Sequence, residues 1–344
     1  MNVKPVHRRS MIECCAVVIA FMAVLAAPAW AAPPADKGSD GVRFFVEPIL
    51  QKGFGGVAYD LSFSQGGGYT GLSRLEFPQL ALEAGLVAGF SISQGEKREW
   101  LVEASVMHST LAFAGSMNDY DWTQYLAYPK VPISYTYSQD STVSWHASLE
   151  AAWTLAFAKP WSLALYGTYR YQDLSHVEDG YTGWQYVPDA TADGVVPVVV
   201  SSTTPDVLEY TLSSHTIGVG LMGDLAPLPG FSLELRAAFT PVYVSDSDDH
   251  KLRTKLSTAS GWGSGFYGDM RAKYLLSRSS GVTPYFALEG ELIYYVVSTT
   301  QTQYWYGNGD AANGGPGQGT LITDVGHVIT STQYQVGLRF GLMF

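Results

Sequence analysis

The segment TQYQVGLRFGLMF, Thr332–Phe344, alternates along its whole length between two kinds of side chain. One set of alternate positions holds Thr332, Tyr334, Val336, Leu338, Phe340, Leu342 and Phe344. The other set holds Gln333, Gln335, Gly337, Arg339, Gly341 and Met343. Successive side chains of a β-strand point to opposite faces, so one face of this segment suits lipid and the other suits a polar interior that tolerates an arginine. The pattern predicts a membrane-crossing β-strand.

The same alternation recurs along the chain, for example over 80–92, 163–171 and 217–225. Four short turns interrupt it, at Gln94–Lys97, Lys159–Ser162, Pro227–Gly230 and Arg278–Gly281. Five longer polar stretches lie between them, at Gln65–Thr70, Ser116–Thr142, Ser175–Leu208, Asp246–Thr258 and Thr302–Gly326. Four turns and five loops separate ten strands, with the short connections on one side and the long ones on the other.

This asymmetry is typical of outer-membrane barrels, in which the long loops face outside. No apolar run after residue 31 approaches the ~20 residues of a membrane-spanning helix. Several strands exceed the ~9–11 residues that cross a bilayer. We therefore predict an all-β fold, a ten-stranded antiparallel transmembrane β-barrel that projects above the outer membrane. A soluble, exported β-sandwich is the alternative.

The N-terminal region has the features of a secretory signal peptide. Basic residues Lys4, Arg8 and Arg9 precede an apolar run, and Ala29-Trp30-Ala31 fits the small-x-small cleavage rule. We expect a signal peptide at 1–31, a flexible lead-in at 32–41 and the barrel at 42–344, in the outer membrane of a Gram-negative bacterium. Both cysteines lie within the signal peptide, which leaves no thiol or disulfide in the mature chain.

The formal net charge of the chain is −11, and no basic stripe is present. Nucleic acid is therefore not expected as a partner. An acidic protein attracts cationic ligands instead.

Two acidic motifs occur where strands three and seven reach the long-loop side, MNDYDW at Met117–Trp122 and VSDSDDH at Val244–His250. Both strands run outward, so both motifs are expected on the same external rim. Residues two apart in an extended chain share a face. Asp119 therefore pairs with Asp121, and Asp246 and Asp248 share a face with His250.

These residue types can activate a water molecule. Two adjacent carboxylates resist double ionisation, so one holds a proton. A carboxylate beside a histidine fixes its tautomer and stabilises the imidazolium. His250 could then take a proton from water, Asp248 could orient His250, and the Asp119/Asp121 pair could position the water. A solvated acidic loop or a Ca²⁺-binding run fits the same spacing.

The two motifs resemble the active-site motifs of the omptin family, ten-stranded outer-membrane aspartyl proteases. The resemblance implies that Asp119, Asp121, Asp248 and His250 are catalytic. It also implies that Asp246 lies at the base of the S1 pocket, which receives the substrate residue before the cleaved bond, and selects a basic side chain there.

A further segment, GLSRLEF at Gly71–Phe77, resembles the first hairpin of the family. Reading back from it without a gap places Asp60 as a second acid of the S1 pocket. The family requires lipopolysaccharide, bound through basic residues on outer strands. Here Ser175 occupies the expected position of one arginine. A lipopolysaccharide requirement would then depend on other contacts, such as Arg170 or Lys273.

The resemblance implies an endopeptidase that cleaves beside basic residues, with dibasic sites as candidates. It implies no metal, and no cofactor unless lipopolysaccharide is required. Its partners would be peptides or proteins with basic residues. The main alternative is a non-enzymatic adhesin or ligand-binding barrel, whose acidic rim only binds cations or cationic partners. A diffusion pore is a third reading, although a narrow ten-stranded barrel should be filled by side chains.

Overall fold

The computed structural model describes residues 41–65, 69–95, 97–111, 113–123, 132–188, 195–276, 282–311 and 314–344. The expected signal peptide lies outside these ranges, as does the lead-in except Gly41, which begins the first strand. Within the described ranges, no helix has the length and apolar character needed to cross a membrane.

The described chain forms a single antiparallel sheet of thirteen strand segments. They are β1 (Gly41–Gln65), β2 (Tyr69–Pro78), β3 (Leu82–Gln94), β4 (Lys97–Leu111), β5 (Phe113–Thr123), β6 (Ser134–Ala158), β7 (Trp161–Pro188), β8 (Val195–Ser202), β9 (Leu208–Leu228), β10 (Phe231–His250), β11 (Lys255–Leu275), β12 (Thr283–Trp305) and β13 (Leu321–Met343).

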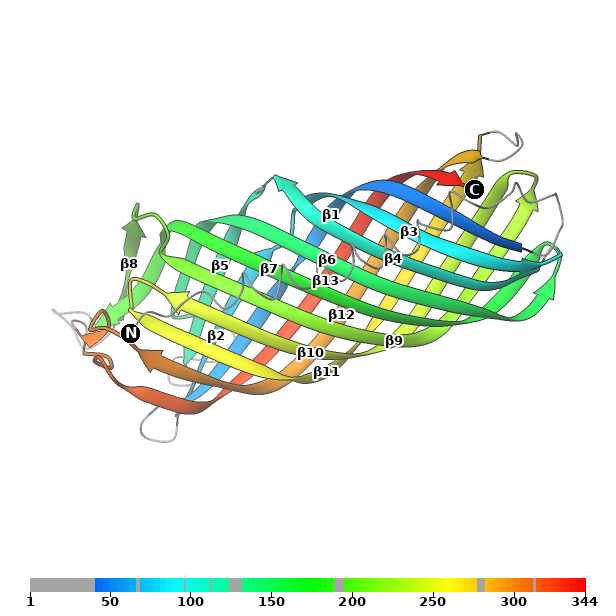
Figure 1. The fold of residues 1–344 in the computed structure, drawn as a ribbon. Coiled ribbons are helices and arrows are strands. Elements are labelled where there is room, and N and C mark those ends of the chain that lie inside the picture. The colour runs from blue at the N-terminus through cyan, green and yellow to red at the C-terminus, as the bar shows by residue number, and fades with distance from the viewer. Residues whose placement is uncertain are drawn as a thin grey trace.

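Ten of these segments close into a ring, in the order β1-β3-β4-β6-β7-β9-β10-β11-β12-β13, with β13 paired back to β1 (Figure 1). β2 and β5 extend the second and third strands of the ring, and β2 pairs with both β1 and β5. β8 pairs with β7 and precedes β9, the sixth strand of the ring. The prediction of a ten-stranded antiparallel barrel is confirmed.

The short connections lie at one end of the barrel and the longer ones, with β8, at the other (Figure 1). β6 has 25 residues, β7 has 28 and β13 has 23. Because roughly 9–11 residues of a tilted strand cross a bilayer, more than half of each long strand lies outside the hydrocarbon layer. The long-loop end therefore projects as a β-sheet rim.

Three stretches predicted as loops are largely strand, and one of them, 246–258, contains the end of β10 and the start of β11. The stretch 116–142 contains the end of β5 and the start of β6, and 175–208 contains the end of β7 and all of β8. Above the membrane both faces of a strand can meet water, so the apolar–polar alternation fades while the backbone hydrogen bonds continue. The sequence pattern therefore reports the part of each strand within lipid and misses the remainder.

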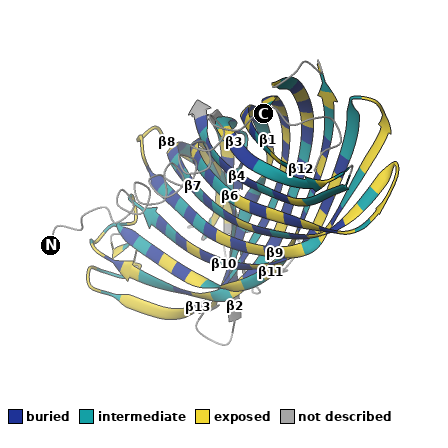
Figure 2. Ribbon diagram, turned by 45° about the vertical axis from the view of Figure 1, so that its right-hand side comes forward, coloured by how far each residue is buried: buried dark blue, intermediate teal, exposed yellow. Residues whose placement is uncertain are grey.

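Exposure alternates along the strands, as the banding of Figure 2 shows. In β13, Leu338 and Phe340 are 52% and 63% exposed, whereas Gln335 and Arg339 are 3% and 7% exposed. Arg339 Nη1 lies 2.9 Å from Glu47 Oε2, which pairs the inward arginine. The predicted apolar and polar faces of this segment are thus the outside and the inside of the barrel.

Ion pairs fill much of the interior. Arg236 contacts the carboxylates of Glu103, Glu150 and Glu234, contributed by β4, β6 and β10. Arg271 Nη1 lies 2.9 Å from Glu103 Oε1. In the described part of the chain this network occupies the space that a diffusion pore would leave open.

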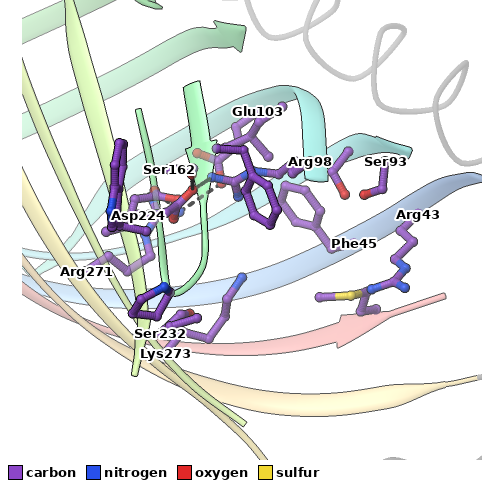
Figure 3. Close-up of a pocket in the computed structure, with 18 of the residues that line it drawn as sticks. Arg43, Phe45, Ser93, Arg98, Glu103, Ser162, Asp224, Ser232, Arg271 and Lys273 are labelled. Carbon is purple, nitrogen blue, oxygen red and sulfur yellow. Dashed lines mark hydrogen bonds and ion pairs between the residues drawn. The ribbon is translucent and has the colours of Figure 1, made fainter. Parts of the chain in front are cut away.

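A recess of about 340 Å³ lies at the short-turn end of the barrel. Arg98, Asp224 and Lys273 are among its lining residues, and Arg98 pairs with Asp224 across it (Figure 3). This recess is therefore far from the projecting rim that carries the two acidic motifs.

Replacing Arg236 by methionine should destabilise the barrel. Three buried carboxylates would each lose one of their cations, and breaking a buried pair costs about 3–5 kcal/mol. Urea unfolding of protein refolded into lipid vesicles measures the change.

Lys97→Met is the matched control, because the Lys97–Glu99 pair is half-exposed at the end of the barrel and its N–O distance is 3.8 Å. Exposed pairs contribute about 0–1 kcal/mol. Equal stabilities of the two variants would show that the network does not support the fold.

Candidate active site

The first acidic motif lies on the inner face of β5, above the membrane-crossing part of the barrel. Asp119 pairs in register with Leu75 of β2, and Asp121 pairs with Ser73. Ser73 Oγ lies 3.5 Å from Asp119 Oδ1. The two aspartates are two residues apart on one strand, so they share a face as predicted.

The second motif ends β10. Asp246 and Asp248 are 4% and 1% exposed, whereas Asp249 faces outward and accepts a 2.7 Å hydrogen bond from Tyr306. His250 Nε2 lies 3.2 Å from Asp248 Oδ2. The alternation of the strand therefore separates Asp249 from the other members of the motif.

Tyr59 of β1 connects the two motifs. It pairs in register with Leu75, which also pairs with Asp119, so Tyr59 and Asp119 belong to the same row of the sheet. The Tyr59 hydroxyl donates a hydrogen bond to Asp248 Oδ2 on β10, a strand that does not pair with β1. This contact crosses the barrel interior and fixes Asp248 opposite the β5 motif.

Both motifs line one cleft of about 450 Å³ at the rim. Asp119 and Asp121 contribute from β5, His250 contributes from β10, and Arg253 follows from the next turn. Among the described residues, no group of three or more His, Cys, Asp or Glu is placed to hold a metal ion. The structure thus brings together Asp119, Asp121 and His250, with Asp248 directly behind His250.

The acid pair on β5 is held toward its protonated form. Burial raises the pKa of Asp119 well above its ordinary value, and the charges of Asp121 and Asp248 raise it further. Burial also raises the pKa of Asp121, against the opposing effects of Ser73 and Arg253. These two carboxyl groups are therefore held toward the protonated form under conditions that ionise an isolated aspartate.

Asp248 and His250 on β10 are held toward their deprotonated forms. Burial alone would raise the pKa of Asp248, but His250, Lys255 and Tyr59 outweigh it and lower the pKa to about 2. Burial lowers the pKa of His250, only partly offset by the Asp248 charge. An ionised carboxylate beside a neutral imidazole is the state that a general base requires.

Asp246 lies below these groups and outside the cleft lining. His327 Nε2 is 2.8 Å from Asp246 Oδ2, and the Tyr210 hydroxyl donates to the same oxygen at 3.3 Å. The predicted specificity residue therefore already has a partner within the protein.

Asp60 does not join the site, and its assignment to the S1 pocket is a correction. Its carboxylate pairs with Arg74 at 3.6 Å, and its side chain is 42% exposed. Its neighbours Tyr59 and Leu61 are 0% and 5% exposed and face inward. A shift of one residue in the alignment exchanges the two faces of a strand, and the inward position is Tyr59.

Sequence reasoning missed two basic residues near the cleft, Arg253 and Lys255. Arg253 Nε lies 2.8 Å from Asp310 Oδ1 in the β12–β13 connection. Lys255 is 4% exposed and pairs in register with His250. Burial, with the nearby charge of Arg253, lowers the pKa of Lys255 to about 8. Their position three and five residues after His250 is the only sequence signal for them.

The two basic residues offered as alternative lipopolysaccharide contacts face the barrel interior. Arg170 Nη2 lies 2.6 Å from Glu291 Oε1, and Arg170 is 8% exposed. Lys273 lies over the ring of Tyr285 and lines the recess at the short-turn end. Neither residue can contact lipid of the outer leaflet, so that expectation is corrected.

No family model matches the chain, and no curated protein matches its sequence. Among solved structures, the outer membrane protease OmpT from Escherichia coli superimposes with a TM-score of 0.69 at 15% identity, over 88% of this chain and 96% of that one. The chain has the fold of an outer-membrane β-barrel. At 15% identity the likeness shows the fold alone.

Two more outer-membrane barrels give weaker superpositions. The outer membrane protein OprG from Pseudomonas aeruginosa has a TM-score of 0.31 and 11% identity, over 90% of this chain and 99% of that one. The translocator domain of the autotransporter NalP from Neisseria meningitidis also has a TM-score of 0.31 and 11% identity, over 95% and 97%. Similarity at this level carries no argument about function.

The pKa of His250 should lie below the ~6.5 of an ordinary histidine. Asp248→Asn should lower it further, because the neighbouring negative charge that favours the imidazolium is removed. NMR titration of protein with labelled histidines, assigned with His250→Asn, measures both values.

Asp246→Asn is the control for this titration. Asp246 contacts His327 and should leave the His250 pKa unchanged. A His250 pKa above ~6.5 would contradict the dominance of burial at this site.

Proposed function

We propose that this chain is an endopeptidase of the outer membrane, of the aspartate type, that cleaves peptides and proteins at the external rim with an activated water molecule. The observation that supports this most directly is the shared cleft, in which Asp119 and Asp121 lie with His250. The OmpT-like fold is consistent with the proposal. No covalent acyl-enzyme intermediate is involved.

His250 serves as the general base. The contact of its Nε2 with Asp248 leaves Nδ1 free to accept a proton from water. The water oxygen then attacks the peptide carbonyl carbon, and the proton remains on the imidazolium beside the Asp248 carboxylate. When the C–N bond breaks, His250 returns this proton to the leaving amine.

The Asp119/Asp121 pair serves the opposite role. A proton held by the pair allows one carboxyl group to donate a hydrogen bond to the oxygen that becomes negative, while the other accepts from the attacking water. The β10 motif therefore acts as the base and the β5 motif as the acid, because their environments lower the pKa of Asp248 and raise those of Asp119 and Asp121.

The substrates are peptide segments that contain basic residues. The net charge of −11 produces a field that draws cationic segments toward the protein, although it does not choose the residue at the cleaved bond. Lipopolysaccharide of the outer leaflet is the lipid partner in this proposal, and activity assays should include it.

His250→Ala and Asp119→Asn should each reduce cleavage by about 10²–10⁴-fold, the range for loss of general acid–base catalysis. Refolded protein is incubated with lipopolysaccharide and a pool of internally quenched peptides that includes dibasic and apolar sequences. Initial rates are measured by fluorescence.

Asp249→Asn is the matched control, because Asp249 lies between Asp248 and His250 in the chain but faces outward. It should cleave as the unchanged protein does. Equal rates for His250→Ala and the unchanged protein would exclude the mechanism. Binding of cationic peptides that survives loss of Asp248 and His250, without cleavage, would identify a ligand-binding barrel instead.

Activity should fall on acidification. His250 is neutral above its pKa, and burial lowers that pKa, so kcat/KM should be retained at pH 6.5 and decline below it. Asp248→Asn should move this decline to still lower pH while reducing the maximal rate. A decline centred above pH ~6.5 would identify a different base.

A further inference from the structure

The Asp246 carboxylate is enclosed beneath the cleft by a pair of residues from other strands. His327 is on β13, three strands away in the ring, and reaches across the interior to Asp246. His327 is 1% exposed and Tyr210 is 0% exposed. The position that a cationic substrate side chain would occupy is therefore filled by an imidazole of the protein.

An aromatic layer covers this level of the barrel. Phe77 stacks on Tyr210 with 4.4 Å between ring centroids, and Tyr59 lies 5.2 Å from Tyr210 and 5.1 Å from His327. All four side chains are less than 2% exposed, and none lines the cleft. A guanidinium could reach Asp246 only by displacing these rings.

The cleft has a mixed lining, with three apolar side chains beside the reactive groups. Leu208 pairs in register with His250, and Val207 precedes it. Met117 is two residues before Asp119 on the same face of β5. Leu208, Met117 and Val207 are 3%, 4% and 7% exposed, and all three line the cleft. An aliphatic or aromatic side chain fits these three contacts, whereas a charged side chain placed against them would lose water and gain no hydrogen bond from them.

We propose that the residue that determines cleavage is apolar, leucine, methionine or phenylalanine, and that it is received by Met117, Val207 and Leu208. His327 is the resident partner of Asp246 and keeps this carboxylate from selecting Arg or Lys. The proposal rests on the proposed endopeptidase function. It assigns to the cleft the substrate choice that the sequence motif suggested for Asp246.

Peptides that differ at a single residue test the preference. With Leu, Met, Phe, Arg or Lys beside one cleavable bond, the apolar peptides should be cut at least about tenfold faster than the basic ones, as apolar pockets discriminate. Asp246→Asn should preserve this ratio. Leu208→Glu should shift the ratio toward Arg and Lys.

A preference for Arg that depends on Asp246 would contradict the proposal. If the unchanged protein prefers Arg and Asp246→Asn loses that preference by about thirtyfold or more, the loss expected when a buried charge pair is broken, Asp246 is the selector and the proposal is wrong.

A binding measurement decides the same question without catalysis. Methylguanidinium, titrated calorimetrically into the refolded full chain, should not bind at Asp246 of the unchanged protein. His327→Ala should create a binding site for it, since Asp246 Oδ1 accepts no hydrogen bond from the described residues and Oδ2 would lose its histidine. The double variant His327→Ala/Asp246→Asn should abolish that site.

His327→Gln is the matched variant, because it retains a donor and should bind no methylguanidinium. Binding to the unchanged protein that Asp246→Asn removes would overturn the proposal, whatever the variants do. If no peptide is cleaved, the proposed function fails, while the methylguanidinium titration still shows whether His327 closes Asp246 to cations.

Discussion

A chain that crosses lipid as β-sheet must pair every backbone N–H and C=O group within the sheet, because the hydrocarbon offers no partner. Closure between β1 and β13 meets this requirement and leaves a ring of ten strands. Such a ring encloses a narrow interior in which each strand places alternate side chains. Polar groups in that interior must then satisfy one another, and the ion pairs around Arg236 and the contacts around Asp248 are two results of this condition.

At the rim, the same condition produces reactive groups. Tyr59 crosses the interior to Asp248, and Asp248 in turn orients His250. Opposite them, Asp119 and Asp121 share a face with no buried cation in hydrogen-bond contact among the described residues. The carboxylate of Asp248 on β10 is therefore stabilised in its ionised form, and the carboxyl groups of Asp119 and Asp121 on β5 in their protonated form. The chemical difference between two aspartate motifs arises from their partners across the barrel.

The local part of this arrangement could be predicted from the sequence. Alternation in Thr332–Phe344 predicted both faces of β13, and the count of turns and loops predicted the ring. The i, i+2 spacing predicted which motif residues face inward and separated Asp249 from Asp248. These features depend only on neighbours along the chain or on the strand next to it.

Contacts across the interior could not be predicted in this way. Tyr59–Asp248 and His327–Asp246 join strands that do not pair, so they depend on register, tilt and side-chain length together. Asp60 was misplaced because one residue of slippage in a gapless alignment reverses its face. The β7–β8 hairpin was missed because strands above the membrane have no lipid-facing side to mark them.

The ion pairs inside the barrel also affect how permeable the membrane is to small solutes. An open β-barrel in the outer membrane admits small solutes, and each added copy increases the leak. The charged network around Arg236 and Arg271 occupies this barrel's centre, so many copies can stand in the membrane without raising its permeability.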